Sequence, residues 1–185
     1  MAKLIYFGNV SINGCTTDDH GKIDFTEPDA EVHFFVNDVL RDVGTHLYGR
    51  RMYETMMVWE TDPQLAESSP QMRDFAGIWK GVEKIVYSST LPAVQTSKTR
   101  LEREFNPDAV RRLIASSERD LLIGGPTLAA QAFRAGLVDE CHMVIAPIVV
   151  RAGLKYLPDD VHFDLRLITS HEFTNGSVYL RYARR

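Results

Sequence analysis

Short apolar segments with the composition of β-strands alternate along this chain with segments of helical periodicity. The first strand is predicted at 4–12, where β-branched and aromatic residues stop at the turn signal Asn13-Gly14. A helix is predicted to start at Thr26-Glu27-Pro28-Asp29, because a Thr cap, a proline and an acid in that order are typical of a helix start. Its apolar positions share one face and form a stripe that packs on a core: Val32, Phe35, Val36, Val39 and Leu40.

The same alternation continues to the C-terminus. Further strands and one extended segment are predicted at 45–48, 83–87, 100–105, 120–123 and 140–150. Helices are predicted directly after Gly49, after Asn106-Pro107 and at 127–135, whereas 61–70 is expected to be a loop. The last two strands, 163–170 and 177–183, flank the hairpin signal Asn175-Gly176.

This order of elements predicts an α/β fold in three layers, with helices on both faces of a mixed, mostly parallel sheet. The final hairpin adds antiparallel strands at one side of that sheet. A length of 185 residues suits one compact domain over 1–185, large enough to bury a core without disulfides or a structural metal.

Composition and charge exclude several classes of protein. The chain carries 25 acidic and 21 basic residues, a formal net charge of −4, which argues against binding to the backbone of a nucleic acid. It contains neither a signal peptide pattern nor a long apolar stretch, so we expect a cytoplasmic protein that binds no membrane. Two distant cysteines make no disulfide framework, and the acidic cluster at 18–24 lacks the spacing of a metal loop.

The most informative chemistry lies at three junctions where a predicted strand ends. The first is Gly49-Arg50-Arg51, where two arginines oppose the dipole of a starting helix, a conflict that an anionic ligand relieves. The second, Ser88-Ser89-Thr90, offers three hydroxyls that bind a phosphate or only satisfy turn amides. The third, Gly124-Gly125-Pro126, is a turn whose backbone amides can approach a pyrophosphate, or simply a tight strand-to-helix turn.

Together these junctions point to a nucleotide with separate phosphate groups, because a parallel sheet brings the carboxyl ends of its strands to one edge. The chain contains neither the GxGxxG fingerprint nor a GxxxxGK[ST] loop, so the ordinary dinucleotide fold and P-loop NTPases are both disfavoured.

An ordered set of short segments resembles the dihydrofolate reductase superfamily, and most of all the branch similar to the reductase domain of bacterial riboflavin-biosynthesis deaminase-reductases. The matching segments are Val10–Gly14, Leu47–Glu54, Val86–Leu91, Leu122–Leu128 and Gly136–Glu140. The resemblance implies a dihydrofolate reductase-like fold, NADPH as the hydride donor and a homodimer, with 140–150 and the C-terminal strands as its candidate interface.

The resemblance also implies the positions of the cofactor site. Gly49 and Arg50, with Arg51 nearby, would hold a cofactor phosphate, and Ser88, Ser89 and Thr90 would lie beside the adenosine 2′-phosphate. The pyrophosphate cradle would comprise Gly124, Gly125, Pro126, Thr127 and Leu128, with a Gly-Gly bond that is often cis in this superfamily. Ile12, Asn13 and Gly14 would border the nicotinamide.

Two positions depart from the branch. Asn13 stands where an aspartate is usual, and an amide cannot supply a proton as an acid would. Met52 stands where a threonine is frequent, so one hydroxyl is missing on the phosphate side.

The proton donor and the substrate contacts are less well defined. Asp29 and Glu31 are candidate catalytic acids on the first helix, although acids in a first turn also stabilise the helix dipole. Trp59 is a candidate for stacking on a planar substrate, or a core or rim aromatic, and His33 is expected to be a surface or packed histidine.

With the resemblance, these observations lead us to expect an NADPH-dependent oxidoreductase that acts on a small heterocycle such as a pterin, a folate or a ribosylaminopyrimidine. The activity would resemble dihydrofolate reductase or the 5-amino-6-(5-phosphoribosylamino)uracil reductase of riboflavin biosynthesis. The deaminase motif of the bifunctional enzyme is absent from this sequence. Two alternatives remain open: a nucleotide-binding protein without turnover, and a flavin-type electron-transfer protein.

Overall fold

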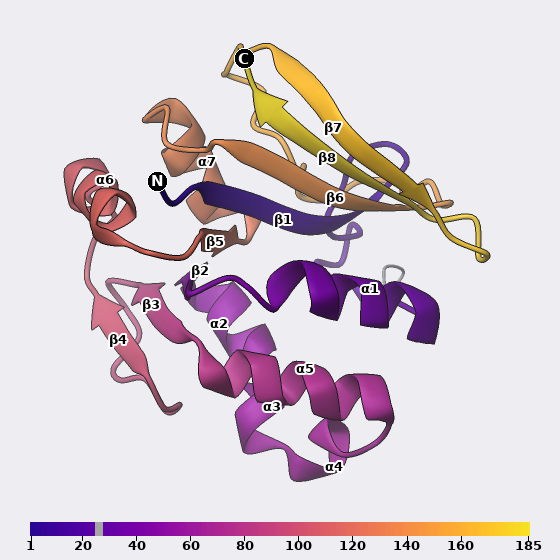
Figure 1. The fold of residues 1–185 in the computed structure, drawn as a ribbon, viewed down its shortest axis with the longest axis horizontal. Coiled ribbons are helices and arrows are strands. Elements are labelled where there is room, and N and C mark those ends of the chain that lie inside the picture. The colour runs from indigo at the N-terminus through magenta and orange to yellow at the C-terminus, as the bar shows by residue number, and fades with distance from the viewer. Residues whose placement is uncertain (25–27) are drawn as a thin grey trace.

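The computed structural model describes residues 1–24 and 28–185. Over these described residues, eight strands form one sheet in the order β4-β3-β2-β5-β1-β6-β8-β7 (Figure 1). The strands are β1 (Leu4–Ser11), β2 (Thr45–Gly49), β3 (Glu83–Tyr87), β4 (Thr99–Glu102), β5 (Leu121–Gly124), β6 (Glu140–Ala146), β7 (Leu165–Glu172) and β8 (Val178–Arg184). From β4 to β6 all neighbours are parallel, and the pairs β6–β8 and β8–β7 are antiparallel. The predicted α/β fold with its C-terminal hairpin is therefore confirmed.

Helices cover both faces of the sheet, which makes three layers (Figure 1). The helices are α1 (Ala30–Leu40), α2 (Arg50–Met56), α3 (Val58–Thr61), α4 (Pro63–Ala66), α5 (Pro70–Gly81), α6 (Pro107–Ser116) and α7 (Pro126–Arg134). α6 and α7 pack on one face, whereas α1, α2 and α5 pack on the other.

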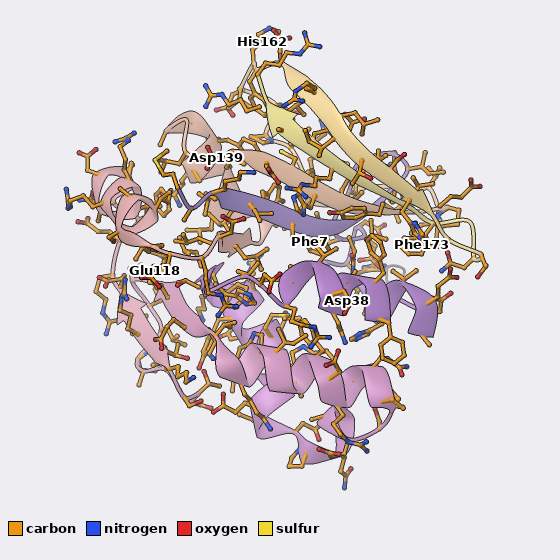
Figure 2. All side chains as sticks on the ribbon, viewed as in Figure 1. Phe7, Asp38, Glu118, Asp139, His162 and Phe173 are labelled. Carbon is orange, nitrogen blue, oxygen red and sulfur yellow. The ribbon has the colours of Figure 1, made fainter. Side chains whose placement is uncertain are left out.

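The alternation of residues along β1 shows how the strands serve both faces. Leu4 and Tyr6 belong to the core under α6 and α7, whereas Ile5 belongs to the core under α1 and α5. Phe7 follows the same alternation and packs against the α1 side, where Figure 2 shows it between strand and helix. Both faces of this central strand are buried, as expected for a parallel sheet.

Helix α5 is the main element that the hydrophobic pattern did not predict. Its start is locally encoded, because the Ser69 hydroxyl accepts a hydrogen bond from the Met72 amide at 3.4 Å and Pro70 occupies the first turn. Trp79 from this helix is completely buried. Helix α4 also lies within the segment that was expected to be a loop.

Several predicted boundaries are wrong: the extended segment predicted over 100–105 is β4 at 99–102, the strand predicted over 163–170 is β7 at 165–172, and the start of α1 and the end of β6 also differ. The Asp29 carboxylate caps α1 by accepting from the Val32 amide at 3.0 Å, so the helix begins at Ala30; the expected cap Thr26 lies outside the described residues. The strand predicted over 140–150 ends at Ala146, because Pro147 has no amide proton to continue the ladder. In the part of the chain that the structure describes, no helix is long and apolar enough to cross a membrane.

Candidate functional site

The three predicted junctions and the loop after β1 lie side by side at the carboxyl edge of the sheet. The strand order β3-β2-β5-β1 places the segments that follow these strands in the order 88–90, 49–51, 124–128 and 12–14. The register is close, since Gly49 pairs with Tyr87 and Tyr48 pairs with Gly124. Segments that are far apart in the sequence therefore form one continuous row.

This row includes the place where the chain changes faces. The connections from β1 to β2 and from β2 to β3 run through α1 and through α2–α5 on one face, whereas α6 and α7 connect β4, β5 and β6 on the other. Strand β5 lies between β2 and β1, so the change of face falls on both sides of the Gly124-Gly125 turn, towards the 49–51 segment and towards the 12–14 loop. In open α/β sheets such a switch point at the carboxyl edge is the usual ligand site.

Helices α2 and α7 start differently from the longer helices elsewhere in the fold. Each follows its strand without a loop, and within the described residues neither has a side-chain cap, since Gly49 and Gly125 stand at the N-cap positions. Helices α1, α5 and α6 are capped by the side chains of Asp29, Ser69 and Asn106. The first amides of α7, those of Thr127 and Leu128, are thus left for a ligand or for water.

The Gly-Gly turn is shaped by close packing. A Cβ at Gly124 would lie 2.9 Å from Cε1 of Tyr48 and 3.4 Å from Cγ of Met52. Gly125 has φ +89°, a conformation that residues with side chains rarely adopt. The peptide bond between them is trans, which differs from the cis bond frequent in the superfamily. Met52 covers the turn at the position where the resemblance implied a hydroxyl.

Arg50 links two of the predicted junctions. Its Nη1 donates to Thr90 Oγ1 at 3.1 Å, and its Nε donates to Glu54 Oε1 at 2.7 Å. Arg51 is exposed, and no described residue forms an ion pair or a side-chain hydrogen bond with its guanidinium. The helix start after β2 therefore carries one cation that is partly neutralised and one that is not.

The hydroxyl turn after β3 has both a structural and an exposed part. Ser88 is 8% exposed, and its Oγ accepts from the amides of Thr90 and Leu91 at 3.2 and 2.9 Å, so this hydroxyl shapes the turn. Ser89 and Thr90 face solvent. Sequence reasoning missed Arg103, whose Nη1 donates to the Leu91 carbonyl at 2.7 Å. The sequence feature that could have identified it is the alternation in 100–105, where an arginine takes the same side as Leu101 and Phe105.

The loop after β1 is held by a residue that departs from the family pattern. Asn13 Nδ2 donates to the Val150 carbonyl at 2.8 Å, and the Val150 amide donates to Asn13 Oδ1 at 3.1 Å. An aspartate could accept the second bond but could not donate the first. The clamp leaves Ile12 63% exposed and Val149 70% exposed, so this end of the row is apolar.

The candidate acids of α1 are already engaged. Asp29 is the helix cap, and Glu31 accepts hydrogen bonds from the amide and the hydroxyl of Thr174 in the β7–β8 turn. Both carboxylates therefore already serve structural hydrogen bonds, and neither stands out as a proton donor.

Trp59 lies on α3, half-buried and edge-on to Phe75 and His33, with ring centroids 4.8 and 5.9 Å away. His33 is buried, and its Nδ1 lies 3.0 Å from Asn37 Oδ1. Burial lowers the pKa of His33, which favours a neutral imidazole.

Residues 2–179 match the family model of the RibD C-terminal domain. The chain belongs to this family. It is 25% identical over 176 residues to the uncharacterized protein YyaP of Bacillus subtilis strain 168, covering 94% of this chain and 90% of that protein.

Solved structures show the same fold. A putative riboflavin biosynthesis protein from Shewanella sp. PV-4 has a TM-score of 0.76 at 20% identity and covers 100% of this chain and 99% of its own. A pyrimidine reductase-like protein from Corynebacterium diphtheriae has a TM-score of 0.66 at 17% identity, with 100% and 92% covered. The match to the RibD C-terminal domain model confirms the expected riboflavin branch of the dihydrofolate reductase-like superfamily, and these structures show that the fold is shared.

Proposed function

We propose that this chain is an NADPH-dependent reductase that transfers a hydride to a small heterocyclic substrate of the pyrimidine or pterin class. The observation that carries the proposal is the continuous row of the segments 88–90, 49–51, 124–128 and 12–14 at the switch point of the sheet. Membership of the RibD C-terminal domain family and the name of the Corynebacterium neighbour support a reductase acting on a pyrimidine-like ring.

The residues present fit a phosphorylated dinucleotide. The uncapped amides of Thr127 and Leu128 would hold the pyrophosphate, because helix starts favour anions. Arg50 and Arg51 would supply charge-assisted contacts to phosphate oxygens. When bound, NADPH supplies the hydride.

The apolar end of the row fits the other half of the proposed reaction. Ile12, held in place by the Asn13 clamp, would shield the reacting ring from water. Trp59 would bound the substrate on the α3 side, and Asp29 or Glu31 would deliver the proton only after release from its present hydrogen bonds.

We also propose that two copies of the chain associate. Strand β6 is paired on both sides, so the free edge in the C-terminal half is β7, where Leu167 and Ile168 are 50% and 40% exposed. The molar mass measured by light scattering is expected to be twice that of the chain, and a mass equal to one chain would contradict the dimer.

The first test is cofactor binding by the wild-type chain and by Arg50→Ala. Loss of a charge-assisted phosphate contact should weaken NADPH binding by about 1.5–3 kcal/mol, measured by calorimetric titration. The matched control is Arg111→Ala, which removes another exposed arginine, one that is paired with Asp108 on α6, and the affinity of this variant for NADPH should equal that of wild type. Equal affinities for all three proteins would remove the Gly49-Arg50 turn from the site.

Turnover is tested separately by following NADPH oxidation at its absorbance maximum with dihydrofolate, a ribosylaminopyrimidine and a quinone. Oxidation with one of these substrates supports the reductase. Binding of NADPH without oxidation in the presence of any of the substrates supports a nucleotide-binding protein without turnover. The observation behind this second candidate is that Asp29, Glu31 and Asn13 all make structural hydrogen bonds.

A further inference from the structure

A cavity of about 320 Å³ lies at the amino ends of the strands, on the opposite side of the sheet from the row of candidate site segments. It is enclosed by the end of α7, the segment that leads into β6, the end of β8 and the segment before β7. Figure 2 shows His162, which lines it, at the end of the molecule where the chain approaches β7. A volume of this size is at the lower end of the range of about 300–1,000 Å³ found for small-molecule sites.

One wall of the cavity is apolar. The rings of Phe133 and Phe163 stack with centroids 5.2 Å apart and planes inclined by 9°. Val138, before β6, and Val161 extend this wall, and all four side chains are buried or half-buried. Such a wall provides a contact surface for a flat apolar group.

The charges in the cavity leave one cation without a partner. Arg134 binds Asp160 through two nitrogens, Nε to Oδ2 at 2.8 Å and Nη2 to Oδ1 at 3.2 Å, so these two charges neutralise each other. Arg184 donates from Nη1 to the Gly136 carbonyl at 3.1 Å. Its Nε and Nη2 form no hydrogen bond within residues 1–24 and 28–185, and no carboxylate there lies within ion-pair distance of it.

The backbone holds the Arg184 guanidinium beside the cavity. The Arg184 amide donates to the Asp139 carbonyl at 2.9 Å, which fixes the end of β8 against the start of β6. Gly136 has φ +64°, and a Cβ there would lie 3.3 Å from Arg184 Nη1, so the glycine leaves space for the guanidinium. Its free N–H groups therefore stand at the cavity together with the exposed imidazole of His162.

An unpaired guanidinium next to an aromatic wall suits a carboxylate with an apolar body. The fork of a guanidinium matches the two oxygens of a carboxylate. A phosphate monoester is doubly charged, and one unpaired arginine would balance only half of its charge. A neutral apolar molecule would contact the wall but would leave Arg184 without a counter-charge.

We propose that this cavity binds a small carboxylic acid with a flat apolar body. The carboxylate pairs with Arg184, and the apolar body lies against the wall of Phe133 and Phe163. The cavity shares no residue with the candidate cofactor site, and the proposal does not depend on the proposed function.

The first test titrates the full-length wild-type protein with 2-naphthoate, 2-naphthamide and inorganic phosphate, each followed by calorimetry. The amide keeps the flat body without the charge, and phosphate is an anion without the body. 2-Naphthoate should bind with a stoichiometry of one per chain, and the other two should bind at least about tenfold more weakly. Equal affinity for the amide would overturn the role of the charge, and equal affinity for phosphate would overturn the role of the wall.

The second test assigns the charge to Arg184. Arg184→Ala and Arg184→Gln should each raise the dissociation constant of 2-naphthoate about tenfold or more and leave that of 2-naphthamide unchanged. The glutamine variant keeps a donor for the Gly136 carbonyl, and urea denaturation checks that both variants fold. The matched control, Arg166→Ala, removes an exposed arginine of β7 that does not line the cavity, and should behave as wild type. Wild-type affinity in both Arg184 variants would overturn the proposal.

The third test locates the ligand by methyl NMR. Addition of 2-naphthoate should shift the methyl signals of Val138 and Val161 and leave those of Val149, at the apolar end of the row, unchanged. Shifts at Val149 alone would place the ligand at the row, and shifts at none of the three would show no binding, so either result overturns the proposal. NADPH takes no part in these experiments, and failure here leaves the proposed function standing.

Discussion

Two groups of charged side chains on the same sheet differ in how completely their charges are paired. Between β6 and β8, Glu140 is 3% exposed and accepts hydrogen bonds from Lys3, from Arg181 through two nitrogens, and from His142. Burial alone would raise the pKa of Glu140, but the bonds from His142, Arg181 and Lys3 outweigh burial and hold the pKa below its usual range. Tyr179 completes the cluster through the other ring nitrogen of His142.

The turn after β3 and the helix start after β2 show the opposite condition. Arg103 and Arg51 are exposed and lack carboxylate partners within the described ranges, and Arg50 forms an exposed ion pair with Glu54. In the first group the carboxylate is buried and shared by its partners, so this group acts mainly on stability. The unpaired guanidinium donors at the carboxyl ends of the strands contribute little to stability and remain available for binding a ligand.

The largest expected effect is on the β6–β8 cluster. Glu140→Ala should lower the free energy of unfolding by about 3 kcal/mol, because the two cations and His142 would be left without their shared partner. Urea denaturation measures the change. The matched control, Asp108→Ala, breaks an exposed pair with Arg111 and should cost less than about 1 kcal/mol. Similar losses in both variants would show that the buried cluster is no more important than a surface pair.

Two buried histidines extend the comparison to pH. Both ring nitrogens of His142 have partners, whereas His46 bonds Tyr48 through Nδ1 and its buried Nε2 has no partner among the described residues. Burial, with the nearby charges of Lys84 and Arg119, lowers the pKa of His46 from 6.5 to about 3. The unfolded chain therefore takes up a proton first as the pH falls, and the stability contributed by neutral His46 is lost from pH 6.5 downwards.

This loss should reach about 1 kcal/mol within the first pH unit below 6.5. Denaturation at a series of pH values measures it. The variant His46→Gln keeps a polar group beside Tyr48 and has nothing to titrate, so its stability should fall less over the same range. A pH dependence equal to that of wild type would assign the loss to other groups.

The smallest expected effect is the change in the free energy of unfolding when Arg51, at the start of α2, is replaced. Arg51→Ala should change the free energy of unfolding by less than about 0.5 kcal/mol, because no ion pair is broken. The same protein should bind NADPH more weakly in the calorimetric titration described above. A large loss of stability with unchanged NADPH affinity would contradict the distinction, because Arg51 would then act on stability, as the Glu140 group does, and not on binding.

Local signals predicted much of the fold. The Asn13-Gly14 and Asn175-Gly176 turns, the Gly-Gly junction and the apolar stripe of α1 each depend on residues close together in the chain, and each is found near its predicted place. Helix α5 was missed although Ser69-Pro70 is a start signal, because the prolines around it also indicate a loop. The stripe of α1 was predicted without its polar members His33 and Asn37, which are buried because they hydrogen-bond to each other and because Asn37 bonds α5.

The candidate site was likewise predicted only in part. The glycines and hydroxyls at the strand ends could be found from the sequence alone, but their roles depended on neighbours far away in the chain. Ser88 shapes its own turn and Asn13 clamps Val150, whereas Arg103 contacts the turn after β3 from the segment that follows β4.

By itself the sequence determined most of the segments that form strands and helices, where the turns fall and which residue types stand at the strand ends, because these depend on short-range periodicity and backbone preference. Only the tertiary structure decided the strand order that places 88–90, 49–51, 124–128 and 12–14 in one row, and with it which cations are paired and which are free. The physical reason is that strand order and charge pairing arise from contacts between residues that are distant in the chain, such as Asn13 with Val150, and local periodicity carries no record of them.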